Sequence, residues 1–131
     1  MSTNHQKFMK VIFGMLCVIF LASCGEDNNA TSSIDAYIEA LSSKDQALIS
    51  NLSCSDWEQN ALIEVDSLTA VGSKVENLVC EEAGKESDLT YISCTGYLEL
   101  DYNGELQQID LSNRIYTARY EDGEWRMCGY K

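Results

Sequence analysis

The sequence contains no proline and one histidine, His5. Without proline, glycine must mark the ends of helices and the turns between strands. Histidine is the commonest general base, nucleophile activator and metal ligand near neutral pH. Because His5 lies in a segment that we expect to be removed, Ser-His-Asp and Cys-His catalysis are excluded for the mature chain. The sequence also has no glycine-rich phosphate loop and no cysteine pair at the two-residue spacing of metal sites.

Basic residues are scarce. The chain has 9 Lys and Arg against 21 Asp and Glu, a formal net charge of -12 at pH 7. A negative field of this kind repels phosphate backbones, so we exclude nucleic acid as a partner. A solvated acidic surface is the simplest interpretation of the charge.

The first 23 residues have the organisation of a signal peptide. Lys7 and Lys10 form a positive leading region, and an uninterrupted apolar stretch runs from Val11 to Ala22. A stretch of about a dozen residues is typical of a signal-peptide core. A bilayer-spanning helix needs about 20 apolar residues, so an N-terminal membrane helix that stays attached is the less favoured alternative.

The segment Leu21-Ala22-Ser23-Cys24 directly follows this apolar stretch. It resembles the lipobox of bacterial lipoproteins, which implies that the Cys24 thiol receives a diacylglyceryl group and that cleavage frees an amine for a further fatty acyl chain such as palmitate. Two or more chains anchor a protein stably because each buried methylene contributes about 0.8 kcal/mol. Cys17 lies within the apolar core without small residues before it, so we expect it to be removed with residues 1–23.

The resemblance also predicts a location. We expect an extracytoplasmic protein held to the cell membrane by its lipid, and because Gly25 rather than Asp follows Cys24, to the outer membrane if the host has two. Residues 24–33 are polar and predict a short flexible tether. Residues 34–131 suffice for one compact domain. Loss of Lys7 and Lys10 makes the net charge of the mature chain about −14.

Four cysteines remain after Cys17 and Cys24 are set aside. An even number in a small exported domain is typical of a disulfide framework. Of the three connectivities, we favour Cys80 with Cys94 and Cys54 with Cys128, because the first two lie on one predicted hairpin and can face each other. Free thiols and a four-cysteine zinc site are the alternatives, and an oxidising compartment disfavours both.

Helical periodicity covers the first half of the domain. Apolar residues recur at helical spacing from residue 34 to 41, behind the cap candidates Ser32 and Ser33, and the pattern restarts at Ser43 and Asp45. Ser55-Asp56-Trp57-Glu58 has the form of a capping box and predicts a second helix that ends before residue 72. The residues that we expect to point inward are Ile34, Tyr37, Ile38, Leu41, Leu48, Ile49, Leu52, Trp57, Ala61, Leu62, Val65 and Leu68.

From residue 74 the period changes to two, which indicates strands at 75–82 and 89–102 joined by a polar turn at 83–88. Asn103-Gly104 is a strong signal for a two-residue hairpin turn, because both central residues of a type I′ turn need positive φ. Such a turn pairs Tyr102 with Glu105. The same register then pairs Leu98 with Ile109, Gly96 with Leu111 and Ile92 with Ile115.

The last hairpin allows two interpretations. A two-residue turn at Asp122-Gly123 would pair Tyr120 with Trp125 and place Trp125 on the face opposite Ile115. We favour a three-residue loop, Glu121-Asp122-Gly123, with Gly123 as a left-handed bulge, because it puts Trp125 and Met127 on the apolar face.

Together these elements predict an α+β fold in which two N-terminal helices pack on a curved, four-stranded antiparallel sheet, with two disulfides. The order of elements, the strands around Tyr102-Asn103-Gly104-Glu105 and the closing segment 120–129 resemble small bacterial lipoproteins of the nuclear-transport-factor-two-like, or cystatin-like, superfamily. The resemblance covers residues 34–131. It implies a cone with a cavity between the helices and the concave sheet, in a group where many exported members have no known activity.

If a cavity exists, we expect its walls to come from Trp57, Tyr102, Ile109, Ile115 and Trp125. The alternative is that these side chains simply fill the core. Enzymes of this fold commonly place Asp with His or Tyr in the cone, and we identify no inward carboxylate here, so that role is not carried over.

A group of acidic residues surrounds the predicted turn at 83–88: Glu81, Glu82, Glu86 and Asp88. It lacks the regular ligand spacing of a calcium loop, so we favour a solvated turn and predict neither a metal nor a cofactor.

The main functional hypothesis is a non-catalytic binding or interaction module at the cell envelope, with a small apolar ligand or an envelope protein as partner. An alternative is an enzyme that uses carboxylate and tyrosine acid–base chemistry in the cone, which requires a buried Asp or Glu with a raised pKa near Tyr97 or Tyr102. A third is a structural dimerisation unit, which requires a large exposed apolar sheet face.

Overall fold

The structure is a computed structural model and describes residues 28–131. The predicted signal peptide at 1–23, His5 within it and the predicted lipidation site Cys24 lie outside the described residues. Within residues 28–131, no helix is long and apolar enough to cross a membrane.

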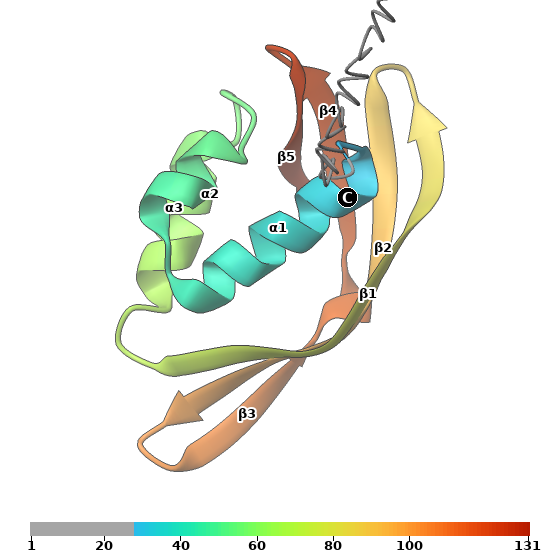
Figure 1. Cartoon of the computed structure of the whole chain (residues 1–131). Helices are drawn as coiled ribbons and strands as arrows, with labels where there is room; N and C mark the ends of the chain where they lie inside the picture. The colour runs from blue at the N-terminus through green and yellow to red at the C-terminus, as the bar shows by residue number, and fades with distance from the viewer. Residues whose placement is uncertain (1–27) are drawn as a thin grey trace, which may run out of the picture.

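Three helices make up the first half of the described chain and cover the concave side of a strongly curved sheet (Figure 1). They are α1 (Ala30–Ser43), α2 (Gln46–Asn51) and α3 (Glu58–Ser67). The core lies between these helices and the sheet, where Ile34, Tyr37 and Ile92 are fully buried. Each such side chain stabilises the fold by about 1.5–3 kcal/mol relative to an exposed position.

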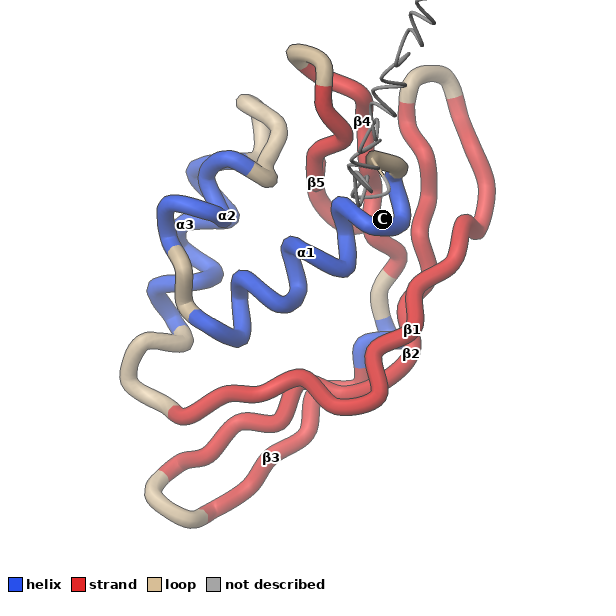
Figure 2. Tube along the Cα trace, viewed as in Figure 1, coloured by secondary structure: helices blue, strands red, loops and turns tan. Residues whose placement is uncertain are grey.

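The sheet of the described residues has five antiparallel strands, shown in red in Figure 2. They are β1 (Gly72–Glu86), β2 (Leu89–Tyr102), β3 (Glu105–Asp110), β4 (Ile115–Glu121) and β5 (Glu124–Tyr130). The order is β1-β2-β4-β5. Strand β4 pairs with residues 89–93 of β2, and β3 pairs with residues 97–102 on the same side of β2. The predicted α+β class is confirmed, with three helices and five strands in place of two and four.

Helix α1 begins at Ala30, so residues 30–33 are helical rather than part of the predicted tether. The cause is a capping box at Asn29. The Ser32 backbone N–H donates to Asn29 Oδ1 at 2.8 Å, and the Asn29 backbone N–H donates to Ser32 Oγ at 3.2 Å. This reciprocal pair satisfies amides that a helix leaves unpaired at its start.

The predicted capping box at Ser55 is wrong. Helix α3 begins at Glu58 without a side-chain cap, because the Cys54 carbonyl accepts from the Trp57 and Glu58 amides at 2.9 Å each. The Ser55 backbone N–H instead donates to Glu121 Oε1 in β4, at 3.1 Å. A tertiary contact thus replaces the local cap.

The first hairpin register is confirmed by the pairs Tyr102 with Glu105 and Leu98 with Ile109. The predicted pairs of Leu111 and Ile115 are wrong because a short 3-10 helix, η1 (Leu111–Asn113), separates β3 from β4. The Asp110 carboxylate starts η1 by accepting from the Ser112 backbone N–H at 2.9 Å. Ile92 therefore pairs with Tyr116 instead of Ile115.

The last hairpin has the two-residue turn, with Tyr120 paired to Trp125 and with φ of 54° at Asp122 and 84° at Gly123. The three-residue loop that we favoured is wrong. The extra residue lies instead at Cys128, where the register shifts between the pairs Ala118 with Met127 and Thr117 with Gly129. Met127 still reaches the core, because β4 presents Tyr116 and Ala118 to it rather than Ile115.

Two disulfides cross-link the described chain. Cys54–Cys128 joins the connection between α2 and α3 to β5, and Cys80–Cys94 joins opposite positions of β1 and β2. This is the expected pairing. The Cys54–Cys128 bond ties the helical half of the described chain to its last strand.

Candidate functional site

The candidate site centres on Glu64 of α3. Glu64 lies three residues after Ala61 and four before Leu68, two residues buried in the core. This helical spacing places its carboxylate at the border of the apolar face. The Glu64 side chain retains 24% of its exposure, so the carboxylate sits where the core meets solvent.

Three donors surround the carboxylate. The Tyr37 hydroxyl donates to Oε2 at 2.8 Å, the Tyr130 hydroxyl donates to Oε1 at 2.6 Å, and Arg114 Nη1 lies 3.2 Å from Oε1. These donors come from α1, the end of β5 and the residue before β4. One carboxylate therefore connects three parts of the chain that are distant in sequence.

Aromatic rings enclose this arrangement. Trp57 Nε1 donates to the Tyr37 hydroxyl at 3.2 Å. The Tyr130 ring meets the rings of Trp57 and Tyr116 edge to face, at centroid distances of 5.5 and 5.2 Å, and Arg114 lies over it at 4.7 Å. Such contacts each contribute about 0.5–1.5 kcal/mol. We call the six residues Tyr37, Trp57, Glu64, Arg114, Tyr116 and Tyr130 the Glu64 cluster.

Gly129 makes room for the cluster. It has a φ of 122°, and a Cβ there would lie 3.2 Å from the Trp57 ring. A side chain at this position would therefore be strained and would displace the indole. The glycine lets Trp57 lie directly against β5.

The buried tyrosines of the cluster are held in their neutral form. Burial raises the pKa of Tyr37 and of Tyr130, and the nearby charge of Glu64 raises both further. Burial also raises the pKa of Tyr116 to about 12. At neutral pH the three hydroxyls are protonated, and those of Tyr37 and Tyr130 donate to Glu64.

A cavity of about 150 Å³ lies beside the cluster, between the helices and the sheet. Its walls are largely apolar, and Arg114, whose side chain is 46% exposed, stands at its mouth with Glu64 and Asp110. The lining residues are Ile38, Leu41, Glu64, Ser67, Leu68, Leu98, Ile109, Asp110, Leu111, Arg114, Tyr116 and Tyr130. An apolar cavity of this size holds one benzene-sized group, well below the 300–1,000 Å³ of pockets for drug-sized ligands.

Of the five predicted pocket residues, Ile109 lines this cavity and Trp57 belongs to the adjoining cluster. The other three do not line it. Tyr102 is 43% exposed at the end of β2. Trp125 packs on Tyr120 at 5.7 Å near the last turn, and Ile115 lies on the face of β4 opposite to Tyr116.

Most of the Glu64 cluster is not evident from the sequence. One signal was available, since Glu64 falls within the predicted inward face of its helix. Tyr37 was recognised as a core residue but not as a donor. Arg114, Tyr116 and Tyr130 could not be found, because their faces depend on η1 and on the bulge at Cys128.

The tyrosines that we named for acid–base chemistry lie elsewhere. Tyr97 and Tyr102 are 39% and 43% exposed on β2. Among the described residues, the carboxylate that accepts hydrogen bonds from tyrosine hydroxyls beside a cavity is that of Glu64. Its tyrosine donors are Tyr37 and Tyr130.

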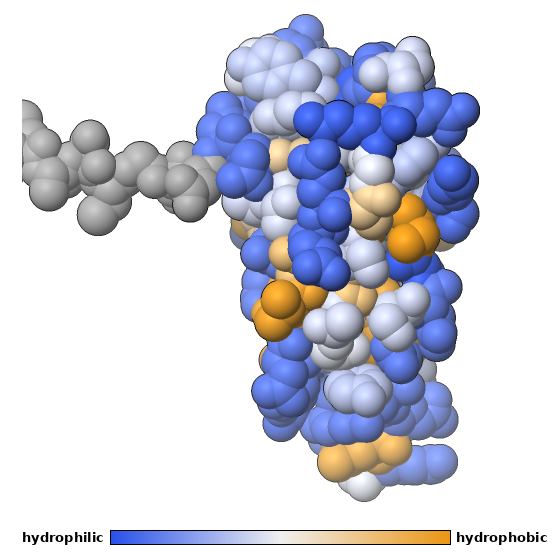
Figure 3. Space-filling view, turned by 90° about the vertical axis from the view of Figure 1, so that its right-hand side faces the viewer, coloured by the Kyte–Doolittle hydropathy of each residue, from blue (hydrophilic) through white to orange (hydrophobic). Residues whose placement is uncertain are grey.

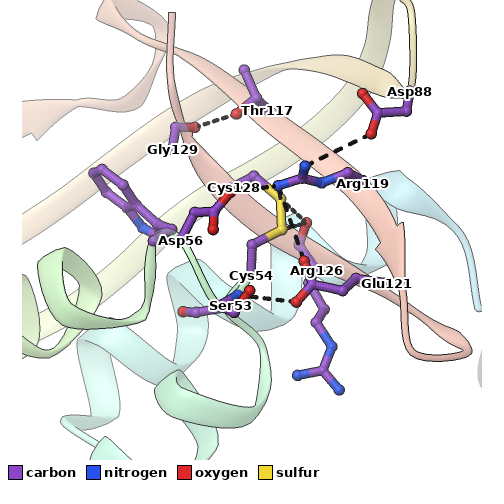
Figure 4. The surroundings of a disulfide bond; sticks show 12 residues. Ser53, Cys54, Asp56, Asp88, Thr117, Arg119, Glu121, Arg126, Cys128 and Gly129 are labelled. Atoms are coloured by element: carbon purple, nitrogen blue, oxygen red, sulfur yellow. Dashed lines mark hydrogen bonds and ion pairs between the residues drawn. A yellow bond between two sulfur atoms is a disulfide. The ribbon is translucent and has the colours of Figure 1, made fainter.

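The Cys54–Cys128 disulfide has a charged environment, shown in Figure 4. Arg119 Nη2 lies 3.9 Å from Cys128 Sγ and 3.4 Å from Asp56 Oδ2, and Nη1 lies 3.7 Å from Asp88 Oδ2. Asp88, a member of the acidic group considered for calcium, is thus ion-paired. No group of three or more His, Cys, Asp or Glu side chains within residues 28–131 is arranged to hold a metal ion.

The convex side of the sheet carries no large apolar area in the view of Figure 3, where apolar residues of the described chain form separate spots among polar ones. Val79 and Leu106 are among its exposed apolar residues, at 64% and 59%. Scattered apolar residues of this kind are normal on soluble surfaces. This view does not favour dimerisation through that sheet face.

No protein-family model matches the sequence, and no curated protein matches it. Among solved structures, the helical cell shape determining protein Pgp2 from Campylobacter jejuni is similar, with a TM-score of 0.50 and 10% identity over 76% of this chain. The aligned region spans 38% of Pgp2, and at this identity the likeness concerns the fold alone. A designed protein, Rd1NTF2, aligns over 75% of this chain and 92% of its own, with 11% identity and a TM-score of 0.43.

Proposed function

We propose that this chain is an exported lipoprotein, anchored to the envelope membrane through Cys24, whose domain is a non-catalytic binding module. The observation that carries the binding role is the apolar cavity of about 150 Å³, whose lining includes four members of the Glu64 cluster: Glu64, Arg114, Tyr116 and Tyr130. Export is supported by the pairing of all four cysteines of residues 28–131 in disulfides, which persist in oxidising compartments. If the host has two membranes, we propose the outer one.

The ligand follows from the size and chemistry of the cavity. It accommodates one benzene-sized apolar group, which is either a small apolar molecule or one side chain of an envelope protein. The carboxylate of Glu64 already accepts from three donors, so the cluster acts as a preformed polar wall that requires no reorganisation when the cavity fills. Preformed walls lower the entropic cost of binding.

Membership of the nuclear-transport-factor-two-like, or cystatin-like, superfamily is part of the proposal. It is supported by the three helices that cover a curved antiparallel sheet and by a cavity between the two layers (Figure 1). The acidic surface is compatible with neutral or cationic partners and disfavours nucleic acid.

Binding is tested with the lipidated protein held in nanodiscs and titrated with toluene and indole, while methyl chemical shifts are followed by NMR. We expect saturable shifts confined to the cavity residues Ile38, Leu98 and Ile109. Ser67→Trp, at an exposed position of the cavity mouth on α3, should abolish them. Ile63→Trp is the matched control, since Ile63 lies on the same helix, is 60% exposed and does not line the cavity. Equal shifts in both variants would contradict the binding role.

Anchoring is tested separately by fractionating cells that produce the native chain or Cys24→Ser. We expect the native protein in the membrane fraction with an acyl-dependent mobility, and an unlipidated precursor for Cys24→Ser. Identical fractionation of the two proteins, with masses that differ only by the replacement of sulfur by oxygen, would contradict a lipid anchor at Cys24.

An enzyme that uses carboxylate and tyrosine chemistry is the second candidate, because Glu64 lies between the hydroxyls of Tyr37 and Tyr130 beside a cavity. We prefer binding for two reasons. The three donors occupy the carboxylate, and the raised pKa of each tyrosine keeps it protonated. Catalysis would require a turnover that Glu64→Gln abolishes while ligand affinity is retained.

A further inference from the structure

Strand β3 (Glu105–Asp110) leaves one edge of the sheet open. It pairs with β2, and with no other strand of residues 28–131. Figure 1 shows the β2–β3 hairpin projecting beyond the helices, and residues 105–109 are all exposed. The open edge ends at the cavity, because Ile109 and Asp110 belong to its lining.

The register defines which backbone groups point outward. Tyr102 and Glu105 flank a two-residue turn and therefore form a hydrogen-bonded pair. Because hydrogen-bonded and non-hydrogen-bonded pairs alternate, Leu106 and Gln108 direct their N–H and C=O groups away from β2. These groups are free to pair with another extended chain.

The other two edges of the sheet are protected. Strand β1 has register shifts between Glu76 and Val79 and between Glu82 and Gly84, and it carries two lysines. Strand β5 is covered at Met127 by a bridge from Ser53, and Trp57 lies against it. Bulges, lysines, prolines and covering segments are the usual means of blocking edge pairing. Within the described chain, β3 has none of them.

The region around this edge is acidic. Strands β2 and β3 contain no Lys or Arg, and their acidic side chains are Glu99, Asp101, Glu105 and Asp110. The neighbouring cations are already engaged, since Lys74 Nζ lies 3.4 Å from Glu99 and Arg114 Nη1 lies 3.2 Å from Glu64. A second copy of the chain would bring like charges together at this edge, which disfavours self-pairing.

We propose that the β3 edge is the docking site for an extended, basic segment of a partner protein, which joins the sheet as a further strand. Adjacent strands lie about 4.8 Å apart, so a side chain of the added strand reaches the cavity mouth next to Ile109. The inference rests on the proposed function for this one side chain. The backbone pairing and the charge preference are independent of it.

The test uses the full lipidated protein in nanodiscs of zwitterionic lipid. The probe is a synthetic ten-residue peptide of alternating Lys and Val with one central Phe. We expect it to protect the Leu106 and Gln108 amides from hydrogen exchange and to bind less tightly as salt increases. A peptide with Glu in place of Lys should not bind. A peptide N-methylated at every backbone nitrogen should not bind either, because neither of its edges carries an N–H group.

A protein variant tests the same edge. Gln108→Pro removes an N–H that points outward and leaves the bonds to β2, as edge strands tolerate. Gln108→Ala is the matched control, because both variants lose the same side chain. We expect Gln108→Pro to weaken peptide binding about tenfold, which corresponds to one hydrogen bond, and Gln108→Ala to leave it unchanged.

Three outcomes would overturn edge docking: equal binding of the Lys and Glu peptides, binding of the N-methylated peptide, or unchanged affinity of Gln108→Pro. Failure of the proposed function looks different. If toluene enters the cavity but the peptide protects neither Leu106 nor Gln108, the binding module stands and edge docking fails. If the peptide protects both amides but no apolar molecule enters the cavity, edge docking stands and the proposed ligand is wrong.

Discussion

The Glu64 cluster leads to a quantitative prediction about stability. Glu64→Ala leaves the hydroxyls of Tyr37 and Tyr130 without their acceptor in a buried ring of aromatic residues. An unsatisfied buried hydroxyl costs about 1–3 kcal/mol, and the half-exposed ion pair with Arg114 contributes at most about 1 kcal/mol. We therefore expect the free energy of unfolding to fall by about 3 kcal/mol. For a domain of this size this lowers Tm by roughly 15 °C.

Two further variants separate the carboxylate from the volume of the side chain. Glu64→Gln keeps the shape and one acceptor oxygen, and its amide can donate to the second hydroxyl, so we expect a loss of about 1 kcal/mol. A double-mutant cycle between Glu64→Gln and Tyr130→Phe should give a coupling energy of about 1–2 kcal/mol, because the two side chains share a hydrogen bond of 2.6 Å.

The assay is equilibrium unfolding in urea with both disulfides intact, followed by the fluorescence of Trp57 and Trp125. Asp66→Ala is the control, since Asp66 is an exposed acid on the same helix and outside the cavity lining. It should change stability by less than about 0.5 kcal/mol. A loss for Glu64→Ala no larger than that of the control, or a coupling energy of zero, would refute the role assigned to Glu64.

Three further predictions concern the disulfide, the tyrosines and a carboxylate of α1. Replacing Cys54 and Cys128 together by Ala should lower the free energy of unfolding by about 4.5 kcal/mol on the chain-entropy model, because the bond closes a loop across most of the domain. Urea unfolding of the non-reduced variant measures this loss, and a loss below about 1 kcal/mol would contradict the prediction. Burial raises the pKa of Tyr116 to about 12 and also raises the pKa of Tyr37 and Tyr130, so the stabilisation from these neutral tyrosines is complete below about pH 10 and is lost as pH rises. Tyrosinate absorbance should therefore increase together with alkaline unfolding. Ionisation of all the tyrosines while the protein stays folded would argue against the cluster. Burial also raises the pKa of Asp35, whose Oδ1 has no hydrogen-bond partner, so its charge destabilises the fold above the folded-state pKa and this cost vanishes in acid. Asp35→Asn should therefore raise Tm at about pH 7 and not at about pH 3. An equal change of Tm at both pH values would exclude this cause.

Local sequence signals were sufficient where local physics decides the structure. The stripe of Ile34, Tyr37 and Leu41 predicted a helix that buries one face, and Asn103-Gly104 set the register that pairs Leu98 with Ile109. The pairing of the four cysteines followed from placing two of them on one hairpin. The class of the fold follows from these elements.

Three features could not be predicted because they depend on competition between local and tertiary contacts. The Asp110 carboxylate starts a 3-10 turn that breaks one long strand into β3 and β4. Ser55 donates its amide to Glu121, across the domain, instead of capping a helix. The bulge at Cys128 shifts the register of β5.

These shifts also explain why the predicted site was incomplete. Strand β4 is shifted by one residue relative to the predicted register, and such a shift exchanges the two faces of a strand. Tyr116 therefore lies beside the cavity in place of Ile115. Tyr130 reaches Glu64 because the bulge at Cys128 turns the end of β5 inward. The partial burial of Glu64 itself is a property of the packed helices, which residue spacing indicates but does not decide.

Intact mass measurement of the protein extracted from membranes of its own host tests the proposed location and anchoring most directly. We predict the mass of residues 24–131 with fatty acyl groups on the first residue, less four hydrogens for two disulfides. Recovery of the full 131-residue chain from the cytosol, without acyl groups and with its cysteines reduced, would contradict the account.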